Sequence, residues 1–238
     1  MVNIWSLFDH ISGSRCVLCG SKAAGLCRRC VTALPANGHR CACCAVPLPA
    51  AADPLRLCPT CQRARPSYDQ AIAPLLYRPP VDHLITELKF HQRLALLDSL
   101  VLRLVDEVLA TRTDTQALPD VLVPVPMHAQ RLRERGFNHA SELAREIGQR
   151  LEIPVDHRLV QRVRPTRPQM KLSRRARRTN LGRAFTSRAI TNRCVAVVDD
   201  VMTTGATAEE VARVLRAQGA RTVECWSVAR TPPRGQEY

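Results

Sequence analysis

Two adjacent carboxylates, Asp199 and Asp200, follow an apolar run and precede a segment of threonine, glycine and alanine. The stretch reads VAVVDDVMTTGAT and covers residues 195–207. Carboxylate oxygens accept hydrogen bonds from neighbouring hydroxyls, as on a ribose ring, or bind Mg²⁺. Threonine hydroxyls and a glycine turn just before a helix favour an anion such as a phosphate group. The chemistry of this stretch is that of a site for a phosphorylated sugar.

An ordinary joint between a strand and a helix is the alternative interpretation of the same stretch. A threonine N-cap, a turn glycine and two solvated aspartates would look similar. The complete order of apolar run, paired aspartates, Thr-Thr-Gly, small residue and threonine favours the ligand site instead. The stretch contains neither the GK[ST] of a Walker A loop nor the GxGxxG of a dinucleotide site, which argues against those two classes. Hydroxyl donors and the turn would come from Thr203, Thr204, Gly205 and Thr207.

Cysteines form the second group of residues with chemical potential. Nine of the eleven lie between Cys16 and Cys61. Because the chain shows no export signal, metal sites are a better interpretation than disulfides, and a thioredoxin-like redox pair lacks its βαβ context. Two CxxC pairs complete the tetrahedron that zinc prefers. The four pairs are Cys16–Cys19, Cys27–Cys30, Cys41–Cys44 and Cys58–Cys61.

The order of these pairs predicts two structural zinc ions, one bound by the first two pairs and one by the last two. Interleaved pairing, or a single site with spare thiols, also fits the sequence. Within CACC, Cys43 competes with Cys44, and the two-residue spacing favours Cys44.

Length and charge limit the class of protein. The 238 residues suit one full domain with a smaller one, and the formal net charge is +14. Two four-thiolate zinc sites, each of charge about −2, would lower this to about +10. Such a charge attracts nucleic acid, nucleotide phosphates or an anionic membrane surface. The first residues lack the pattern of a secretory signal and no apolar run is long enough to span a bilayer, so we expect a cytoplasmic protein without membrane insertion.

Strands and helices that would position these residues alternate beyond about residue 66. A cysteine-rich module, residues 1–65, has too few apolar residues for a core of its own, and an α/β domain, residues 66–238, follows it. The alternation predicts a parallel sheet with helices on both faces, and the two aspartates then lie at its carboxyl edge, where ligands bind. Predicted strands are 71–77, 120–126, 193–198 and 221–230, and predicted helices are 81–90, 94–110, 137–151 and 206–220.

A basic segment precedes the predicted strand at 193–198. Residues 158–180 hold nine lysines or arginines and no acid. The segment is interpreted as a solvated hood near 158–185, as a cover for a diphosphate group, or as a contact for a nucleic-acid backbone. Aromatic residues make up only 4% of the chain, so binding of single-stranded DNA would be mainly electrostatic and sensitive to salt.

The stretch VVDDVMTTGAT resembles the phosphoribosyl-pyrophosphate (PRPP) binding motif of type I phosphoribosyltransferases. Together with the cysteine-rich segment, LKF (88–90), VPVP (123–126), RGFNHA (135–140) and NLGRAF (180–185), it makes nearly the full chain similar to the ComF/GntX family. The resemblance implies that Asp199 and Asp200 contact the ribose hydroxyls and a Mg²⁺-bound diphosphate, and that the turn at 123–128 lies on the diphosphate side. The 5′-phosphate would be surrounded by Met202, Thr203, Thr204, Gly205, Ala206 and Thr207.

The resemblance also implies a role in natural transformation or in the use of imported DNA. Single-stranded DNA and competence helicase or recombination-mediator proteins are the implied partners. Thr203 replaces the aspartate that 6-oxopurine phosphoribosyltransferases use on the base ring, which argues against purine salvage. An active phosphoribosyltransferase with another acceptor is the second hypothesis, with no catalytic residue assigned. Candidate contacts to diphosphate or DNA are Arg131, Arg133, Arg135, Arg174, Arg175, Arg177 and Arg178.

Overall fold

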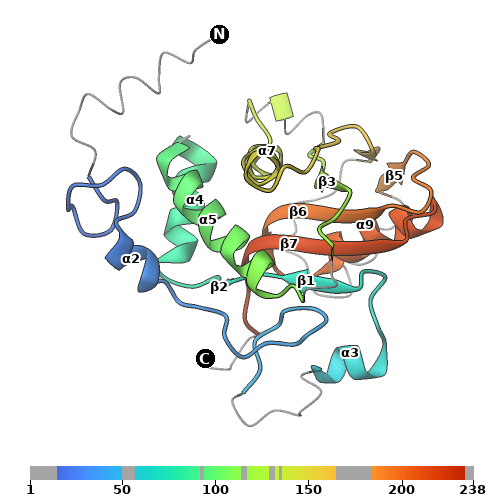
Figure 1. Cartoon of the computed structure of the whole chain (residues 1–238), viewed down its shortest axis with the longest axis horizontal. Coiled ribbons are helices and arrows are strands. Elements are labelled where there is room, and N and C mark those ends of the chain that lie inside the picture. Colours follow the sequence, from blue (N-terminus) through green and yellow to red (C-terminus); the bar gives the residue numbers. More distant parts are fainter. Residues whose placement is uncertain are drawn as a thin grey trace.

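A parallel sheet forms the centre of the protein (Figure 1). The structure is a computed structural model that describes residues 15–49, 57–91, 94–113, 117–128, 132–133, 136–164 and 184–233. Five strands pair in the order β1-β7-β6-β3, with β2 also on β7, and every one of these pairings is parallel. The predicted parallel α/β fold is therefore confirmed. The strands are β1 (Gln70–Ile72), β2 (Leu75–Leu76), β3 (Val121–Pro124), β6 (Cys194–Met202) and β7 (Thr222–Arg230).

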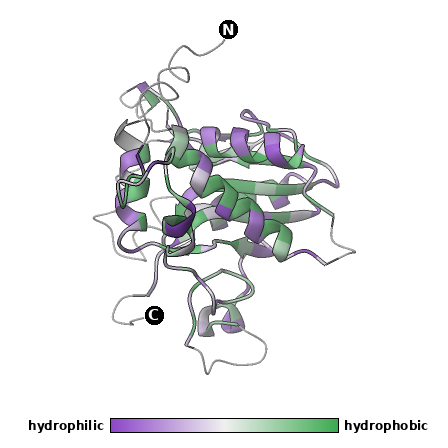
Figure 2. Ribbon diagram, turned by 60° about the vertical axis from the view of Figure 1, so that its left-hand side comes forward, coloured by the Kyte–Doolittle hydropathy of each residue, from purple (hydrophilic) through white to green (hydrophobic). Residues whose placement is uncertain are grey.

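Helices cover both faces of this sheet because its central strands are apolar on both sides. One face carries α4 (Val81–His91), α5 (Leu94–Ala110) and α7 (His139–Leu151), and the other carries α9 (Ala206–Ala217). Figure 2 shows apolar residues along the strands and mixed residues along the helices. In the described part of the chain, no helix combines the length and apolarity needed to cross a membrane.

Two predicted strands differ from the observed ones. The strand predicted at 71–77 is interrupted at Pro74, whose carbonyl accepts a hydrogen bond from the Asn37 amide at 2.7 Å, and it becomes β1 and β2. The strand predicted at 193–198 continues to Met202 because β7 pairs with it along that length. Its other neighbour, β3, stops opposite Val198. The paired aspartates consequently lie within β6, just beyond the end of β3.

A small antiparallel pair was not predicted. Strands β4 (Val160–Arg162) and β5 (Phe185–Ser187) bring together residues near the two ends of the basic segment. Phe185 is buried in the core shared with α9. Residues 165–183 of the basic segment lie outside the described residues.

The cysteine-rich segment packs against both faces of the sheet. Its first part, with Cys16 and Leu26, shares a core with α4 and α5. Its second part, with Cys41 and Cys61, shares a core with α9. Two short helices, α2 (Arg28–Thr32) and α3 (Pro59–Arg63), belong to these two parts (Figure 1). The predicted boundary near residue 65 remains a prediction.

Candidate functional site

A pocket lies beside the carboxyl ends of β6 and β7, against the first turn of α9. It is open to solvent, and the empty space in and around it is about 340 Å³. Asp199 is one of the residues that line it. Asp200 and Thr204 are sequence neighbours of lining residues but do not line it themselves. The lining residues are Val125, Val197, Asp199, Val201, Met202, Thr203, Gly205, Ala206, Thr207, Ala208, Cys225 and Ser227.

The turn from β6 into α9 has the geometry of an anion-binding loop. Gly205 is the N-cap of α9 with φ +79°, a left-handed conformation that glycine adopts without strain. Its carbonyl accepts the Glu209 amide at 2.8 Å, which closes the first helical turn. Thr204 Oγ1 accepts the Ala206 amide at 3.4 Å. The amino end of a twelve-residue helix, with its positive dipole, therefore borders the pocket.

Only one of the two aspartates, Asp199, lines the pocket. Asp199 stands opposite Ser227 of β7, and both residues line the cavity. The Asp199 carboxylate accepts the backbone amide of half-buried Asp200 at 2.9 Å. The Asp199 carboxylate supplies oxygen atoms of the kind that Mg²⁺ accepts as ligands.

Asn138, which was not among the predicted site residues, fixes the turn after β3. Its side-chain amide donates to the Val125 carbonyl at 3.0 Å, and its side-chain oxygen accepts the Ala140 amide at 3.2 Å as the N-cap of α7. Val125 in turn donates its amide to the Val198 carbonyl at 2.9 Å. Asparagine before an amphipathic helix is the sequence signal that identifies such a cap.

The candidate arginines are mostly outside the part of the chain that the structure describes. Arg133 is described and exposed. The predicted contacts of the others therefore stay predictions. The residues outside the described ranges are Arg131, Arg135, Arg174, Arg175, Arg177 and Arg178.

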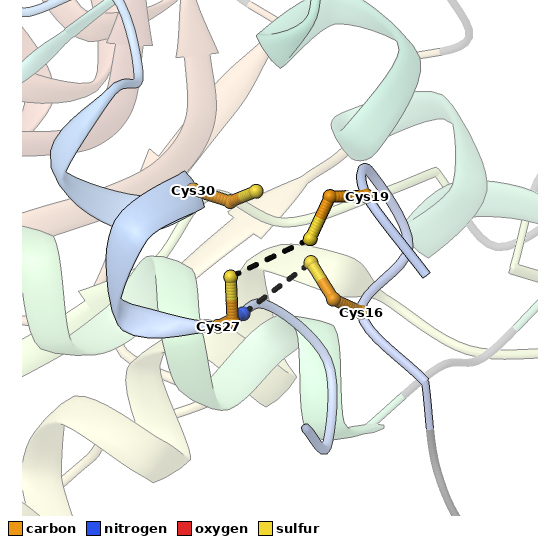
Figure 3. Close-up of side chains that lie close together, drawn as sticks. All are labelled: Cys16, Cys19, Cys27 and Cys30. Carbon is orange, nitrogen blue, oxygen red and sulfur yellow. Dashed lines mark hydrogen bonds between the residues drawn. The ribbon is translucent and has the colours of Figure 1, made fainter. Parts of the chain in front are cut away.

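Eight cysteines form two groups of four. The sulfurs within each group lie within 4.8 Å of one another. The first cluster is Cys16, Cys19, Cys27 and Cys30 (Figure 3). The second cluster is Cys41, Cys44, Cys58 and Cys61.

The sulfur positions in both clusters fit a zinc ion. Tetrahedral zinc with Zn–S bonds of about 2.3 Å places its ligand sulfurs roughly 3.8 Å apart. In the first cluster Cys19 and Cys27 are 3.6 Å apart, and in the second Cys44 and Cys58 are 3.7 Å apart. The pairing of first with second and third with fourth CxxC is the predicted one. Cys44 rather than Cys43 belongs to the second cluster, also as predicted.

Backbone amides stabilise a thiolate in each cluster. The Cys58 amide donates to Cys41 Sγ at 3.3 Å, and the Cys27 amide donates to Cys16 Sγ at 3.4 Å. The side chain of Cys44, against an opposing effect of burial, lowers the pKa of Cys41 to about 4. Burial raises the pKa of Cys16, but hydrogen bonds from backbone amides outweigh it and lower that pKa to about 6. Thiolate is the form that binds zinc. The contact that lowers the pKa of Cys41 raises that of Cys44, so the two sulfurs share one proton when no metal is bound.

Comparisons with known proteins agree with this geometry. The family described as "Phosphoribosyl transferase domain" matches residues 94–237. DNA utilization protein YhgH of Salmonella typhimurium is 35% identical over 222 residues, which cover 91% of this chain and 96% of that protein. Competence protein F of Haemophilus influenzae is 35% identical over 179 residues, which cover 73% of this chain and 78% of that protein.

Solved structures show a weaker likeness. Adenine phosphoribosyltransferase from Leishmania tarentolae aligns with a TM-score of 0.36 and 20% identity, covering 57% of this chain and 58% of that one. A TM-score this low does not by itself establish a shared fold.

Proposed function

This chain belongs to the phosphoribosyl transferase domain family and to the family of DNA utilization protein YhgH and Competence protein F, and from that membership we propose that it binds PRPP with Mg²⁺ in the pocket between β6, β7 and α9. The observation that carries the proposal is the convergence of the Asp199 carboxylate, the Gly205 turn and the amino end of α9 on one cavity. These groups match a sugar that bears hydroxyls and a phosphate.

Each part of the ligand has a matching group in this arrangement. The 5′-phosphate would accept hydrogen bonds from the loop at 203–207 and benefit from the dipole of α9. The ribose hydroxyls would donate to Asp199 and Asp200. The diphosphate would extend toward the turn after β3, near Val125. Bound Mg²⁺ would supply positive charge that offsets the charge of the diphosphate.

Thermal unfolding with and without ligand tests this proposal. At a PRPP concentration of about 100 times Kd, with Mg²⁺, we expect the midpoint to rise by roughly 5–10 °C. Ribose 5-phosphate, which lacks the diphosphate, should give a smaller rise. Asp199→Asn should remove most of the effect, while Asp106→Asn, at an exposed position on α5, should retain it. An equal rise in wild type and Asp199→Asn, or none in wild type, would contradict the proposal.

A role in the use of DNA follows from the relatives' names and the charge of the chain. We propose that the protein binds single-stranded DNA electrostatically, since its formal net charge is +14. Competence helicase or recombination-mediator proteins are the proposed partners. The logarithm of the DNA affinity should fall linearly with the logarithm of salt concentration, with a slope of roughly −0.7 per neutralised phosphate.

The arginines of the basic segment are the proposed DNA contacts. Neutralising Arg174, Arg175, Arg177 and Arg178 together should reduce the slope by roughly 2 to 3. A flat response to salt in wild type would contradict electrostatic binding. An unchanged slope in the neutralised variant would remove these arginines from the contact.

Active phosphoribosyl transfer is the second candidate, favoured by the family match over residues 94–237. An active enzyme should release diphosphate from PRPP when its acceptor is supplied. Thr203, which cannot act as the acid on a purine ring, directs the search toward other acceptors. Tight PRPP binding without diphosphate release across a broad panel of bases and other acceptors would favour the binding role alone.

A further inference from the structure

Arg230, the last residue of β7, is buried and bonded to main-chain carbonyls. Only 5% of the surface of this residue is exposed to solvent. The guanidinium donates to the carbonyl oxygens of Cys44 at 3.0 Å, Met202 at 2.9 Å and Thr231 at 3.2 Å, and also to that of Thr203. Arg230 thus connects the second cluster to the loop that borders the pocket.

The charge of Arg230 explains why it constrains the loop. A buried guanidinium is strongly destabilising unless its donors are bonded, and carbonyl dipoles that point at one another repel without a cation between them. In a trans peptide the C=O and the following N–H point in opposite directions. Since the carbonyls of Met202 and Thr203 face Arg230, the amides of Thr203 and Thr204 point away from it. Arg230 therefore holds the direction of these two loop amides, together with the Thr231 amide, which donates to the Met202 carbonyl at 3.1 Å.

Two residues that follow the second cluster in the chain contact the loop and the first turn of α9. The phenol oxygen of Tyr68, a residue in the same core as Cys41, lies 3.4 Å from the position that a Cβ on Gly205 would occupy. Ser67 donates to the Glu209 carboxylate in the first turn of α9 through both its amide and its hydroxyl, each at 2.8 Å. The second cluster and the loop at 202–205 thus share one continuous set of contacts.

We infer that Arg230 is a positioning residue through which the second cluster holds the loop at 202–205 in the conformation that binds phosphate. The consequence for affinity rests on the proposed PRPP site. Loss of metal from the second cluster would weaken ligand binding through Cys44 and Arg230. Loss of metal from the first cluster, which packs against α5 on the opposite face of the sheet, would not.

Hydrogen exchange of the ligand-free protein tests the inference without reference to any ligand. In Arg230→Lys, which keeps the charge but loses donors, the Ala206 amide, which donates to Thr204 Oγ1 in the loop, should exchange faster by about tenfold. The matched control is Arg112→Lys, because Arg112 makes two 2.7 Å bonds to Glu224 on the same strand β7 and contacts no loop carbonyl in the described contacts. Exchange of the Ala206 amide should be unchanged there. Wild-type exchange rates in Arg230→Lys would overturn the inference.

Wild-type protein provides a second measurement if Arg230→Lys does not fold. A chelator removes zinc step by step, and exchange of the Ala206 amide is measured as a function of the zinc that remains bound. Exposed Cys19 in the first cluster should make that ion leave first, without a change in the loop. Departure of the second ion should accelerate loop exchange by about tenfold. A loop that does not respond to the second ion would overturn the inference.

Ligand affinity distinguishes this inference from the proposed function. Arg230→Lys should raise the Kd for PRPP with Mg²⁺ by about tenfold, whereas Arg112→Lys should stay within about twofold of wild type. Absence of binding by wild type and by Arg112→Lys would count against the PRPP site and leave the exchange result to decide the role of Arg230. Equal affinity of Arg230→Lys and wild type would count against the inference alone.

Discussion

The two cysteine clusters each consist of two CxxC pairs but differ in their surroundings. In the second cluster all four cysteines are buried, whereas in the first only Cys16 is buried and Cys19 is exposed. The second cluster packs on the face of the sheet that carries α9 and the pocket, and the first packs on the face that carries α4 and α5. Two similar cysteine clusters therefore lie where the cysteine-rich segment packs on the sheet, and only the second lies on the face that carries the candidate ligand site.

The two clusters differ in the kind of contact that surrounds them. Gly25, between the two CxxC pairs of the first cluster, has φ +70° and lies against the backbone of Ala95 in α5. The neighbouring Leu26 amide donates to Ser99 Oγ at 3.3 Å. The first cluster thus depends on close backbone approach to one helix. The second depends on side chains, Tyr68 and Arg230, that also contact the pocket loop.

Removal of a ligand from the second cluster should have the largest effect. Cys58→Ser should release one of two zinc ions and lower the unfolding midpoint by roughly 10 °C or more, because a structural zinc site contributes several kcal/mol. Zinc analysis measures the number of ions that remain bound, and thermal unfolding measures the midpoint. The control is Cys43→Ser, since Cys43 is buried beside the cluster but is not one of its four ligands. It should keep two ions, and loss of zinc from this control would refute the assignment of ligands.

The same change in the first cluster should have a smaller effect. Cys19→Ser should also release one zinc ion, but because Cys19 is exposed we expect about half the loss of stability of Cys58→Ser. The Kd for PRPP should stay within about twofold of wild type. A larger rise in Kd for Cys19→Ser than for Cys58→Ser would reverse the comparison of the two clusters.

Gly25→Ala tests the close approach of the first cluster to α5. A Cβ on Gly25 would overlap the Ala95 carbonyl, and the left-handed backbone is unfavourable for alanine. We expect a loss of about 3 kcal/mol in the free energy of unfolding, measured with denaturant. Gly20→Ala is the matched control, because Gly20 has φ +74° but nothing within 4 Å of its Cβ position. It should cost about 1 kcal/mol, and equal losses in the two variants would show that the overlap is absent.

Ser67→Ala should have the smallest of these effects. It removes the hydroxyl bond to Glu209 while the amide bond at 2.8 Å remains, so we expect a loss of about 1 kcal/mol in the free energy of unfolding. Ser187→Ala, which removes an exposed hydroxyl bond to the Arg188 carbonyl, should change it by less than about 0.5 kcal/mol. A loss no greater than that of the control would mean that the hydroxyl bond does not stabilise the contact with α9.

Local patterns predicted part of this molecule. The apolar runs and helical periods gave the parallel α/β fold, the CxxC spacing gave both clusters, and family membership confirms the resemblance to the ComF/GntX family. Features that depend on distant residues were not predictable. The last four residues of β6 are strand because β7 pairs with them, and β4 and β5 join across a long segment. Arg230 is one of 35 lysines and arginines, and only the fold distinguishes it from a surface charge.

Diffraction from crystals grown with PRPP and Mg²⁺ tests the central claim most directly. The account predicts density for a phosphate within hydrogen-bond distance of the amides at 204–207, with the ribose hydroxyls at Asp199. It also predicts that the carbonyls of Met202 and Thr203 still face Arg230. Density for the ligand elsewhere on the protein, with this pocket empty, would contradict the account.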